Sequence, residues 1–584
     1  MHFTNLAGWL SAAGVVAATS YDYIIVGGGP SGIITAERLT AANKSVLLLE
    51  RGQGPTVATG ANVTLPWDNQ LTPIDVPGLS EGVAATDVWQ SYICKDAPSA
   101  SACVLGGGST VNYMVFVHPA DHDFDDKWPV GWKWNDVKAA AERLYSRNRG
   151  TTHPSADGKL YEQKLYNSLS KVLGRFGFHS VDMIEKPNEK HEVYSHPSWN
   201  VKDQLRAGPL RTYLPLAQER GNFELRTGTK VIRVVRDGSK MTGVEIEAAT
   251  GSNKTEIVSI KPNGRIVLAG GATQSPRVLW NSGIGRASQI EIAAKSGVKV
   301  PARDQWIDLP VGEGLKDHPI FSITLKSNET FNKRNGPAIL NGTALTDIAA
   351  YENNRTGSLT EGKHELIIFT SREGSDGQTR FFQGSCAADS EGVFTIKVYL
   401  THGLTSSGTL SLNETQTTYI SETPYLTTEA DKKSASDFVG EMLQKLLSRG
   451  TGYSLVTPTN VTALLDNVSA GSHYVGTTKI GTDSGLQNGT AVVDLDTKVY
   501  GTDNLVSLNR LNACSSPSLT PPSSSSTAAS TPTCPPATSR PPSWWLPRLL
   551  SPRSWLSSKI FRILPDLSSH NLPSMEDDTP ENEF

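Results

Sequence analysis

The chain has 584 residues, a formal net charge of −4 and 38% hydrophobic residues. A chain of this length folds as several domains or as one large enzyme unit, and its apolar content suffices for substantial cores, which excludes a small binding module. Positive and negative residues nearly balance, so the bulk charge excludes nucleic acid and membrane surfaces as partners.

Residues 1–19 contain an apolar stretch, Leu6–Ala18, that ends in small residues. Such a stretch is too short to span a bilayer and is typical of a cleaved secretory signal, although no Lys or Arg precedes it here. Asn-x-Ser/Thr glycosylation sites agree with secretion, for example those at Asn328, Asn413 and Asn467. We therefore expect a secreted, extracellular protein.

Residues 21–52 predict one complete strand–turn–helix–strand unit. The apolar run Tyr23–Val26 indicates a buried strand, and a Gly-x-Gly-x-x-Gly motif follows it directly. Its glycines allow a tight turn, close approach of a pyrophosphate and close packing of the next helix, whose N-terminus attracts phosphate. The expected dinucleotide-binding residues are Gly27, Gly29, Ser31, Gly32 and Glu50, the last at the end of the second strand, where a carboxylate can accept hydrogen bonds from a ribose diol.

The five cysteines do not form a disulfide framework. Cys94 and Cys103 are close in sequence and either close a loop by a disulfide in an oxidising compartment or remain two buried thiols, and we favour the disulfide. The sequence offers no Cys-x-x-Cys or His-rich cluster, so we expect no metal site.

The first domain is predicted to span residues 20–315, with excursions into a second domain. Strand and helix signals alternate with glycine-rich turns, as in a doubly wound α/β domain of the Rossmann-like type. Phe223–Glu247 indicates consecutive strands that turn at Asp237–Ser239. Arg265–Ala269 indicates a buried strand, which a helix at Ser275–Ser282 follows.

Residues 316–455 are predicted to form a substrate domain on a largely antiparallel sheet with helices. Segments such as Phe321–Leu325 and Thr395–Leu400 alternate in hydrophobicity, and Ser434–Ser448 has a helical pattern. Residues 456–505 are expected to return to the first domain through short strands and turns. From residue 506 to 584 the chain is rich in Ser, Pro and Thr, so we expect an aberrant, disordered tail there.

Four further segments carry a family resemblance. They are Ala102–Asp125 with its Gly106-Gly107-Gly108-Ser109 run, Gly271–Gly285, Trp306–Pro319 and Ser472–Gly481. Together with the N-terminal motif they closely resemble the glucose–methanol–choline (GMC) family of flavin oxidoreductases over residues 20–505. Within the family, the segments Ile93–Asn112, Arg206–Ala217 and Gln305–Gly312 are most similar to the flavin domain of cellobiose dehydrogenases.

The resemblance implies FAD as the cofactor, with its ADP part on the N-terminal motif. It places further cofactor contacts at Gly107, Gly108, Ser109, Asn112, Val115, Val231 and Asp503. Some relatives attach FAD covalently through a histidine just before the asparagine. This chain has Val111 at that position, so the resemblance implies a noncovalent flavin.

The resemblance also implies that His473 is the catalytic base. Alcohol oxidation removes the hydroxyl proton while a hydride leaves the same carbon for the flavin, and a neutral imidazole suits the first task. His318, in the sequence Asp-His-Pro, fits a structural role better.

The chain departs from the family after Leu505. Relatives continue there with a strand and a short helix that carry a second catalytic His or Asn. Ser526–Arg548, back-translated with permitted codons, can be read in a neighbouring frame as a family-like C-terminus, and Val506-Ser507 can be encoded by a splice-donor sequence. We hypothesise a retained intron over roughly residues 506–523 and a shifted frame beyond it; the alternative is a natural low-complexity tail.

The leading function is therefore oxidation of a CH–OH group of a sugar or alcohol, with oxygen, a quinone or a redox protein as acceptor. A flavin-containing lyase on the same fold is one alternative. A non-catalytic product that binds FAD is the other, because the predicted C-terminal damage removes part of the site.

Overall fold

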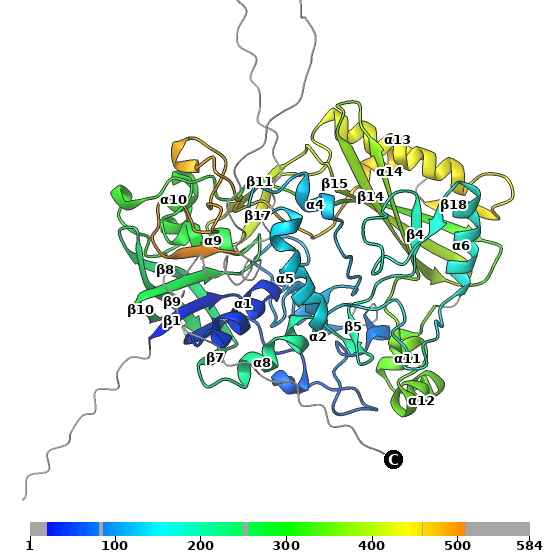
Figure 1. Cartoon of the computed structure of the whole chain (residues 1–584), viewed down its shortest axis with the longest axis horizontal. Coiled ribbons are helices and arrows are strands. Elements are labelled where there is room, and N and C mark those ends of the chain that lie inside the picture. Colours follow the sequence, from blue (N-terminus) through cyan, green and yellow to red (C-terminus); the bar gives the residue numbers. More distant parts are fainter. Residues whose placement is uncertain (1–19, 81–85, 249–254, 332, 458–459, 509–584) are drawn as a thin grey trace, which may run out of the picture.

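The computed structural model describes residues 20–80, 86–248, 255–331, 333–457 and 460–508. The predicted signal peptide and residues 509–584 of the predicted tail lie outside these ranges. Two sheet-based units lie side by side, with the first sheet at the left of Figure 1 and the second at the right.

The first sheet has seven strands. Six follow the order β7-β2-β1-β10-β9-β8, and the seventh, β20, pairs with the edge of β10 that faces away from β1. The strands are β1 (Tyr21–Val26), β2 (Val46–Leu49), β7 (Phe223–Arg226), β8 (Thr229–Asp237), β9 (Lys240–Ala248), β10 (Thr255–Leu268) and β20 (Leu505–Ser507). The central strands β7, β2, β1, β10 and β20 are parallel, whereas β8 and β9 form an antiparallel hairpin with the first half of β10. The predicted strands at 223–247 and 265–269 are thereby confirmed.

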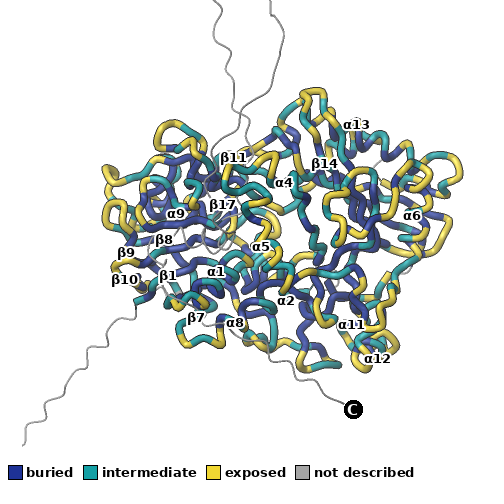
Figure 2. The backbone as a smooth tube through the Cα atoms, in the orientation of Figure 1, coloured by how far each residue is buried: buried dark blue, intermediate teal, exposed yellow. Residues whose placement is uncertain are grey.

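Both faces of the parallel strands are buried. Ile24 and Leu47 pack into one core, whereas the alternate residues Ile25 and Leu48 pack into another together with helix α1 (Pro30–Ala41). Strands covered on both faces have continuous apolar sequences, which is why these segments were recognisable. Figure 2 shows the buried segments concentrated around each of the two sheets.

The second sheet has eight strands in the order β18-β12-β15-β14-β13-β4-β3, with β19 also pairing with β12. The strands are β3 (His179–Ser180), β4 (Val193–Ser195), β12 (Pro319–Ser327), β13 (Leu366–Glu373), β14 (Thr379–Ser390), β15 (Val393–His402), β18 (Tyr453–Thr457) and β19 (Ser469–Ala470). All pairs except β3–β4 are antiparallel, as predicted. Helices α6 (Lys164–Arg175) and α13 (Glu429–Leu446) contribute to its core (Figure 1).

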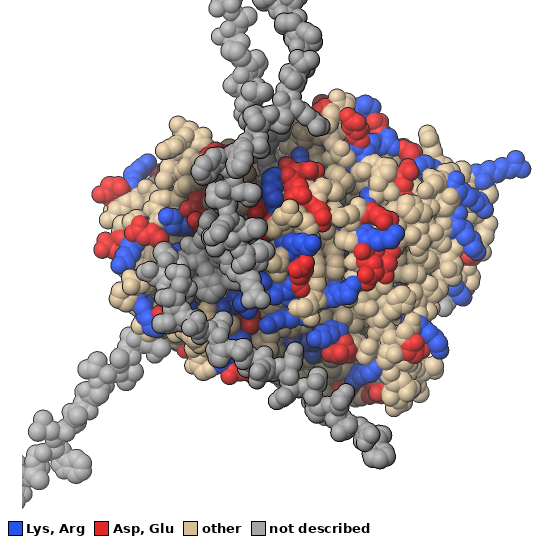
Figure 3. Space-filling model, in the orientation of Figure 1, with Lys and Arg blue, Asp and Glu red and all other residues tan. Residues whose placement is uncertain are grey.

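Smaller elements connect the two units. A three-stranded sheet contains β11 (Glu313–Leu315), β16 (Gly408–Leu412) and β17 (Thr418–Glu422). The other helices are α2 (Asp87–Ser91), α3 (Gly108–Val111), α4 (Asp121–Asp125), α5 (Trp134–Arg147), α7 (Pro209–Thr212), α8 (Leu214–Gln218), α9 (Ser275–Asn281), α10 (Ala287–Lys295), α11 (Gly336–Leu340), α12 (Leu345–Asn354) and α14 (Val461–Asp466). Among the described residues, no helix is both long and apolar enough to cross a membrane. Charges of both signs are interspersed on the face shown in Figure 3.

One predicted helix start was wrong and one helix was not predicted, and side-chain caps explain where both helices begin. Helix α13 begins at Glu429 rather than at Ser434, because the Thr428 side chain accepts a hydrogen bond from the Asp431 backbone N–H. Helix α14 occupies an interval where we expected strands and turns, and the Asn460 side chain caps it in the same way. Caps of this type satisfy backbone donors that the helix itself leaves unpaired.

The predicted boundary of the tail at residue 506 also needs correction. Val506 and Ser507 pair with Val267 and Leu268 of β10, and both are almost completely buried. Leu508 continues this register, since its N–H donates to the Leu268 carbonyl. Residues 506–508 therefore belong to the folded unit, because a Val-Ser step can complete a parallel strand whatever follows it.

A buried ion pair joins α13 to the second sheet. The Arg380 guanidinium donates to an Asp431 carboxylate oxygen at 2.8 and 3.1 Å, and both side chains are fully buried. Burial raises the pKa of Asp431, but the hydrogen bonds from Ser406 and Arg380 outweigh it and hold this pKa below the usual 3.8. Its stabilising contribution is therefore complete above the unfolded-state pKa and is lost as the pH falls through the folded-state value.

Asp431→Asn is expected to lower the free energy of unfolding by about 3 kcal/mol at pH 7, since it leaves Arg380 buried with less compensation. Asp437→Asn is the matched control on the same helix: its exposed pair with Lys433 is worth at most about 1 kcal/mol. Urea denaturation at pH 7 and pH 3 measures both variants. The ion-pair assignment is contradicted if the two substitutions have equal effects. It is also contradicted if the stability difference between wild type and Asp431→Asn is no smaller at pH 3 than at pH 7.

Candidate functional site

The turn after β1 requires glycine for steric reasons. Gly27 has a φ of 108°, and a Cβ on Gly32 would lie 2.0 Å from the Gly27 carbonyl oxygen. Helix α1 therefore packs against the turn at a distance that only glycine permits. This is the close helix–strand packing that the sequence motif predicted.

Helix α1 presents an uncompensated N-terminus. It begins after Gly29, which provides no side-chain cap, carries Pro30 in its first turn and has no acidic residue there. Ser31 lies in the same turn. The first N–H groups and the positive end of the helix dipole together make an anion site, so this end of α1 fits a phosphate group.

A second glycine turn faces the first. The Gly106 N–H donates to the Gly28 carbonyl at 2.8 Å, and a Cβ on Gly107 would lie 2.9 Å from the Gly29 Cα. Gly107 has a φ of 55°, and α3 begins directly after it at Gly108. Two glycine backbones thus approach each other at the carboxyl end of β1, where an open α/β sheet binds its ligand.

Ser109 and Asn112 are fixed by hydrogen bonds on either end of α3. The Ser109 hydroxyl donates to the Gly106 carbonyl at 2.7 Å. The Asn112 side-chain oxygen accepts from the Met114 N–H and from the guanidinium of the buried Arg206 at 3.0 Å. Both residues are therefore held in one orientation beside the glycine turn.

Glu50 is buried and binds backbone on both sides. Its two carboxylate oxygens accept hydrogen bonds from the N–H groups of Gly28 and Gly52, each at 2.7 Å. Burial raises the pKa of this carboxyl, and these two hydrogen bonds offset only part of the effect. In the structure Glu50 ties the glycine turn to the end of β2; its contact with a ribose remains a prediction.

Of the remaining predicted cofactor residues, Val231 and Val115 lie near the glycine turns, whereas Asp503 does not. Val231 lies in β8, and β8 begins next to Glu50, because the Thr229 N–H donates to the Glu50 carbonyl at 2.9 Å. Val115 follows the Asn112 segment and pairs with Trp199. Asp503 instead accepts from the Ser239 hydroxyl in the β8–β9 turn. That turn is at the far end of β8, and Asp503 precedes β20, so it lies at the amino ends of the parallel strands. The structure therefore does not bring Asp503 to the glycine turns, and its contact with the cofactor stays a prediction.

His473 is exposed on a turn that one buried carboxylate holds in place. Asp317 accepts from the His473 N–H at 2.7 Å through one oxygen. Its other oxygen accepts from the Ser472 N–H at 3.0 Å and from the Tyr425 hydroxyl at 2.6 Å. Asp317 is only 1% exposed. Burial and the neighbouring carboxylate raise the pKa of Tyr425, which keeps its hydroxyl a donor.

The structure brings His318 against His473. Their Nδ1 atoms are 3.0 Å apart, and Asp317 also accepts from the His318 N–H at 2.8 Å. The ring of Tyr399, in β15, lies 6.0 Å from the His473 ring at an angle of 28°. Sequence reasoning missed both Asp317 and the pairing of the histidines; the available signal was the Asp-His-Pro motif itself.

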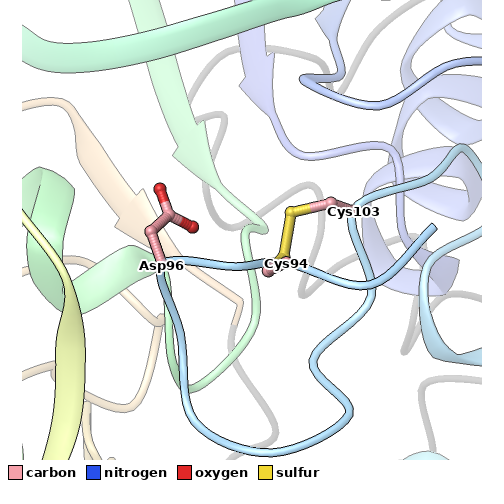
Figure 4. Close-up of side chains that lie close together, drawn as sticks. All are labelled: Cys94, Asp96 and Cys103. Carbon is pink, nitrogen blue, oxygen red and sulfur yellow. A yellow bond between two sulfur atoms is a disulfide. The ribbon is translucent and has the colours of Figure 1, made fainter. Parts of the chain in front are cut away.

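The disulfide predicted between Cys94 and Cys103 is present, with a Cα–Cα distance of 5.1 Å. Figure 4 shows it at the base of a loop that carries Asp96. The ligand atoms of these three residues lie within 4.8 Å of one another, but the sulfurs are bonded together, so no thiolate is offered to a metal. Arg51 and Arg277 hold the Asp96 carboxylate at 2.9 and 2.7 Å. Burial raises the pKa of Asp96, but the two guanidinium groups lower it well below its usual range.

The disulfide loop, residues 94–103, contacts both the segment after Glu50 and the turn that carries His473 (residues 471–474, the histidine turn). At one end, a Cβ on Gly52 would lie 2.1 Å from the Cys103 carbonyl oxygen. At the other end, the hydroxyls of Ser99 and Ser472 share a hydrogen bond of 2.7 Å. The backbone after Glu50 and the backbone before His473 therefore contact the same short loop.

Replacing Cys94 and Cys103 by serine is expected to lower the free energy of unfolding by about 2–3 kcal/mol, because a short closed loop loses its constraint on the unfolded chain. Chemical denaturation of the double variant measures this change. Lys95→Ser, at an exposed position of the same loop, is the control for a serine substitution that leaves the disulfide closed, and it is expected to change stability by less than about 0.5 kcal/mol. A double variant as stable as the wild type would contradict a structural role for this disulfide.

Known proteins share this architecture. The family described as GMC oxidoreductase matches residues 21–320 with its N-terminal model and residues 405–514 with its C-terminal model. A fatty acid photodecarboxylase of Chlamydomonas reinhardtii is 26% identical over 421 residues, 67% of this chain and 65% of that protein. A glucose oxidase of Penicillium chrysogenum is 27% identical over 361 residues, 54% of each chain. The chain thus spans less than two thirds of these relatives.

Among solved structures, pyridoxine 4-oxidase from Mesorbium loti superposes with a TM-score of 0.62 at 19% identity. The superposition covers 84% of this chain and 94% of that chain. At this identity the likeness concerns the fold alone, and it confirms the predicted combination of a Rossmann-like unit with a second, sheet-based unit.

Proposed function

Because the chain belongs to the GMC oxidoreductase family, we propose that it is an FAD-dependent oxidoreductase that oxidises a CH–OH group of a sugar or alcohol. The observation that carries the proposal is the position of His473. It is an exposed imidazole on a turn fixed by Asp317. The disulfide loop contacts both that turn, through Ser99 and Ser472, and the backbone after Glu50, which itself binds the glycine turn.

The residues at the carboxyl end of β1 fit the ADP part of FAD. The backbones of Gly29 and Gly107 are too close for a side chain between them, and we call this pair of turns the cradle. The uncapped N-terminus of α1 beside it would bind an anion. Gly27, Gly32 and Glu50 would shape this end, while Gly108, Ser109 and Asn112 would line the flavin side. Bound FAD would supply the acceptor for a hydride from the carbinol carbon.

His473 would hold and move the proton. Its ring would accept the proton of the substrate hydroxyl as the C–H bond breaks, a task that suits a neutral imidazole. The hydrogen bonds to Asp317 keep the turn from shifting when the ring becomes charged. The second sheet, through residues such as Tyr399, would supply the substrate-facing wall.

We propose that the flavin is noncovalent, since Val111 cannot form the histidyl bond that the resemblance associates with this position. Acid precipitation of the full chain tests this point. Free FAD in the supernatant is expected, whereas yellow colour that stays with the precipitated protein would show a covalent bond.

A flavin-containing lyase is the second candidate function. The likeness to a protein named fatty acid photodecarboxylase supports this alternative. The two functions differ in what happens to the flavin. An oxidoreductase bleaches its flavin when an alcohol is added without oxygen, whereas a lyase forms product with the flavin still oxidised. A screen of sugars, alcohols and fatty acids, followed by flavin absorbance, separates them. A second panel of oxygen, quinones and redox proteins identifies the acceptor.

The C-terminus raises the third candidate, a non-catalytic FAD-binding product. We propose that a retained intron and a frame shift replace the family's second catalytic residue and that the frame-corrected chain is the more active form. Sequencing the spliced transcript tests the first part; a mature message that still encodes Ser523–Arg548 contradicts it. Equal turnover of the two chains at equal FAD content contradicts the second part.

We also propose that the protein is secreted and glycosylated, and closest to the flavin domain of cellobiose dehydrogenases. Exposed acceptor sites on the folded unit support the first point, at Asn62, Asn328, Asn341, Asn354, Asn467 and Asn488. A mass shift on enzymatic deglycosylation of the protein from its natural source is expected. An intracellular, unmodified protein contradicts it, and a failure to oxidise cellobiose in the donor screen counts against the second point.

A further inference from the structure

His318 lies against the proposed base although its sequence context suggested a structural role. We propose that His318 is a positioning residue that fixes the tautomer of His473, so that the basic lone pair of His473 is on Nε2. This inference rests on the proposed function, because it concerns the atom that would take the substrate proton. The evidence for it is the contact between the two rings and the hydrogen bonds that both residues make to Asp317.

The contact determines how the two rings share hydrogens. The Nδ1 atoms are 3.0 Å apart, with ring centroids at 5.0 Å and an angle of 68° between the planes. A hydrogen bond at this distance needs one N–H and one lone pair. Two protonated rings would place two N–H groups against each other. The pair therefore carries at most one positive charge while the contact lasts.

Only one direction of this hydrogen bond is compatible with a base. If His473 donates from Nδ1 to His318, the lone pair of neutral His473 is on Nε2. If His318 donates instead, neutral His473 carries its hydrogen on Nε2 and offers no lone pair there. Once His473 is protonated, both of its nitrogens carry hydrogen, so it must donate to His318. The first direction thus lets His473 take a proton without breaking the contact.

The spacing of the rings is set by the backbone rather than by the side chains alone. One Asp317 oxygen accepts from the N–H groups of both His318 and His473, at 2.8 and 2.7 Å. A Cβ on Gly471 would lie 2.7 Å from the His318 carbonyl oxygen, so the two chain segments touch. Asp317 is thus a carboxylate that both segments share.

Other ionisable side chains face the pair from each neighbouring element. They are Tyr399 and His402 on β15, Tyr425 after β17, Tyr474 on the histidine turn and Asp123 on α4, beyond His402. The His402 ring is 6.5 Å from that of His318. Among these side chains, His318 contacts a ring nitrogen of His473 directly.

The test is a long-range ¹H–¹⁵N NMR spectrum of the FAD-loaded full chain labelled at histidine, which identifies the protonated nitrogen of each ring. His473→Ala assigns the signals. We expect neutral His473 to carry its hydrogen on Nδ1 in the wild type and to revert to the Nε2–H form, which free histidine prefers, in His318→Ala. A wild-type spectrum with the Nε2–H form overturns the inference, and this result needs no variant to fold.

Kinetics supply the second readout. His318→Ala is expected to slow anaerobic flavin reduction about 10- to 100-fold, with little change in donor Kd. His318→Asn, whose side-chain oxygen can accept from His473, is expected to recover part of the rate. His179→Ala, at an exposed histidine on β3, is the matched control and should keep the wild-type rate. Unchanged rates in both His318 variants overturn the inference.

The two proposals fail in different ways. If no donor bleaches the wild-type flavin although His473 shows the Nδ1–H form, the proposed function is wrong and the histidine pairing stands. If a donor does bleach the flavin but the tautomer of His473 does not depend on His318, the pairing is wrong and the proposed function stands.

Discussion

His473→Ala is expected to slow anaerobic reduction of bound FAD by its alcohol donor about 10²- to 10⁴-fold while FAD remains bound. The reason is that the variant lacks the base for the hydroxyl proton, whereas the glycine turns that would hold FAD are unchanged. Stopped-flow absorbance of the flavin measures the rate, and gel filtration measures the retained FAD. The exposure of the ring on its turn means that its removal leaves the core intact.

His473→Gln and His179→Ala complete this experiment. The glutamine variant keeps a polar side chain but no base, so it is expected to be as slow as the alanine variant. His179 is exposed on β3, the terminal strand of the second sheet, and its replacement should leave the rate unchanged. Flavin reduction at the wild-type rate in both His473 variants would show that another group takes the proton.

Gly32→Ala is expected to abolish FAD retention and to destabilise the first unit. The added Cβ would lie 2.0 Å from the Gly27 carbonyl oxygen, so α1 must move away from the turn that faces Gly107. A displaced helix N-terminus no longer meets the phosphates. The expected result is a protein purified with less than about a tenth of the wild-type FAD, since a 1.4 kcal/mol loss of binding energy already costs tenfold in affinity.

Gly174→Ala is the matched control, because it makes the same substitution in another helix. Gly174 is exposed in α6, and a Cβ there would meet nothing within 4 Å. Its replacement is expected to stabilise the protein by up to about 1 kcal/mol and to leave FAD content unchanged. FAD content and thermal unfolding of both variants are measured side by side; a Gly32→Ala protein with full FAD content contradicts the proposed cradle.

The parts of the fold that sequence could predict are those with local, strong patterns. The continuous apolar runs of β1 and β2 and the glycine motif between them specify a buried parallel strand pair and its crossover helix. Alternation at Phe321–Leu325 and Thr395–Leu400 specified the antiparallel sheet, and those strands pair directly in the structure. The cysteine spacing specified the disulfide.

The parts that escaped depend on single side chains or on distant contacts. One threonine and one asparagine cap decide where α13 and α14 begin, and periodicity does not register them. The position of Asp503 at the amino ends of the parallel strands was not predictable, because the motif around it does not reveal which end of the sheet it occupies. The His318–His473 contact joins residues 155 positions apart, so no spacing argument reaches it.

The C-terminal boundary shows a third limit. The change in composition after Leu505 predicted the loss of folded structure from residue 506, yet Val506 and Ser507 complete the edge of the parallel strands. A short parallel strand needs only a few hydrogen bonds and one buried face, so composition over a longer window conceals it. Under the proposed intron, which would start at Val506, the first intron-encoded residues still complete β20, and the shifted frame would begin only after about residue 523.

The central claim is that this chain oxidises a CH–OH donor with a bound flavin, and the anaerobic flavin spectrum tests it most directly. We predict that at least one sugar or alcohol bleaches the oxidised flavin, that one carbonyl product forms per flavin, and that deuterium at the carbinol carbon slows the bleaching. A flavin that stays oxidised with every donor, in a protein that retains FAD, would contradict the account.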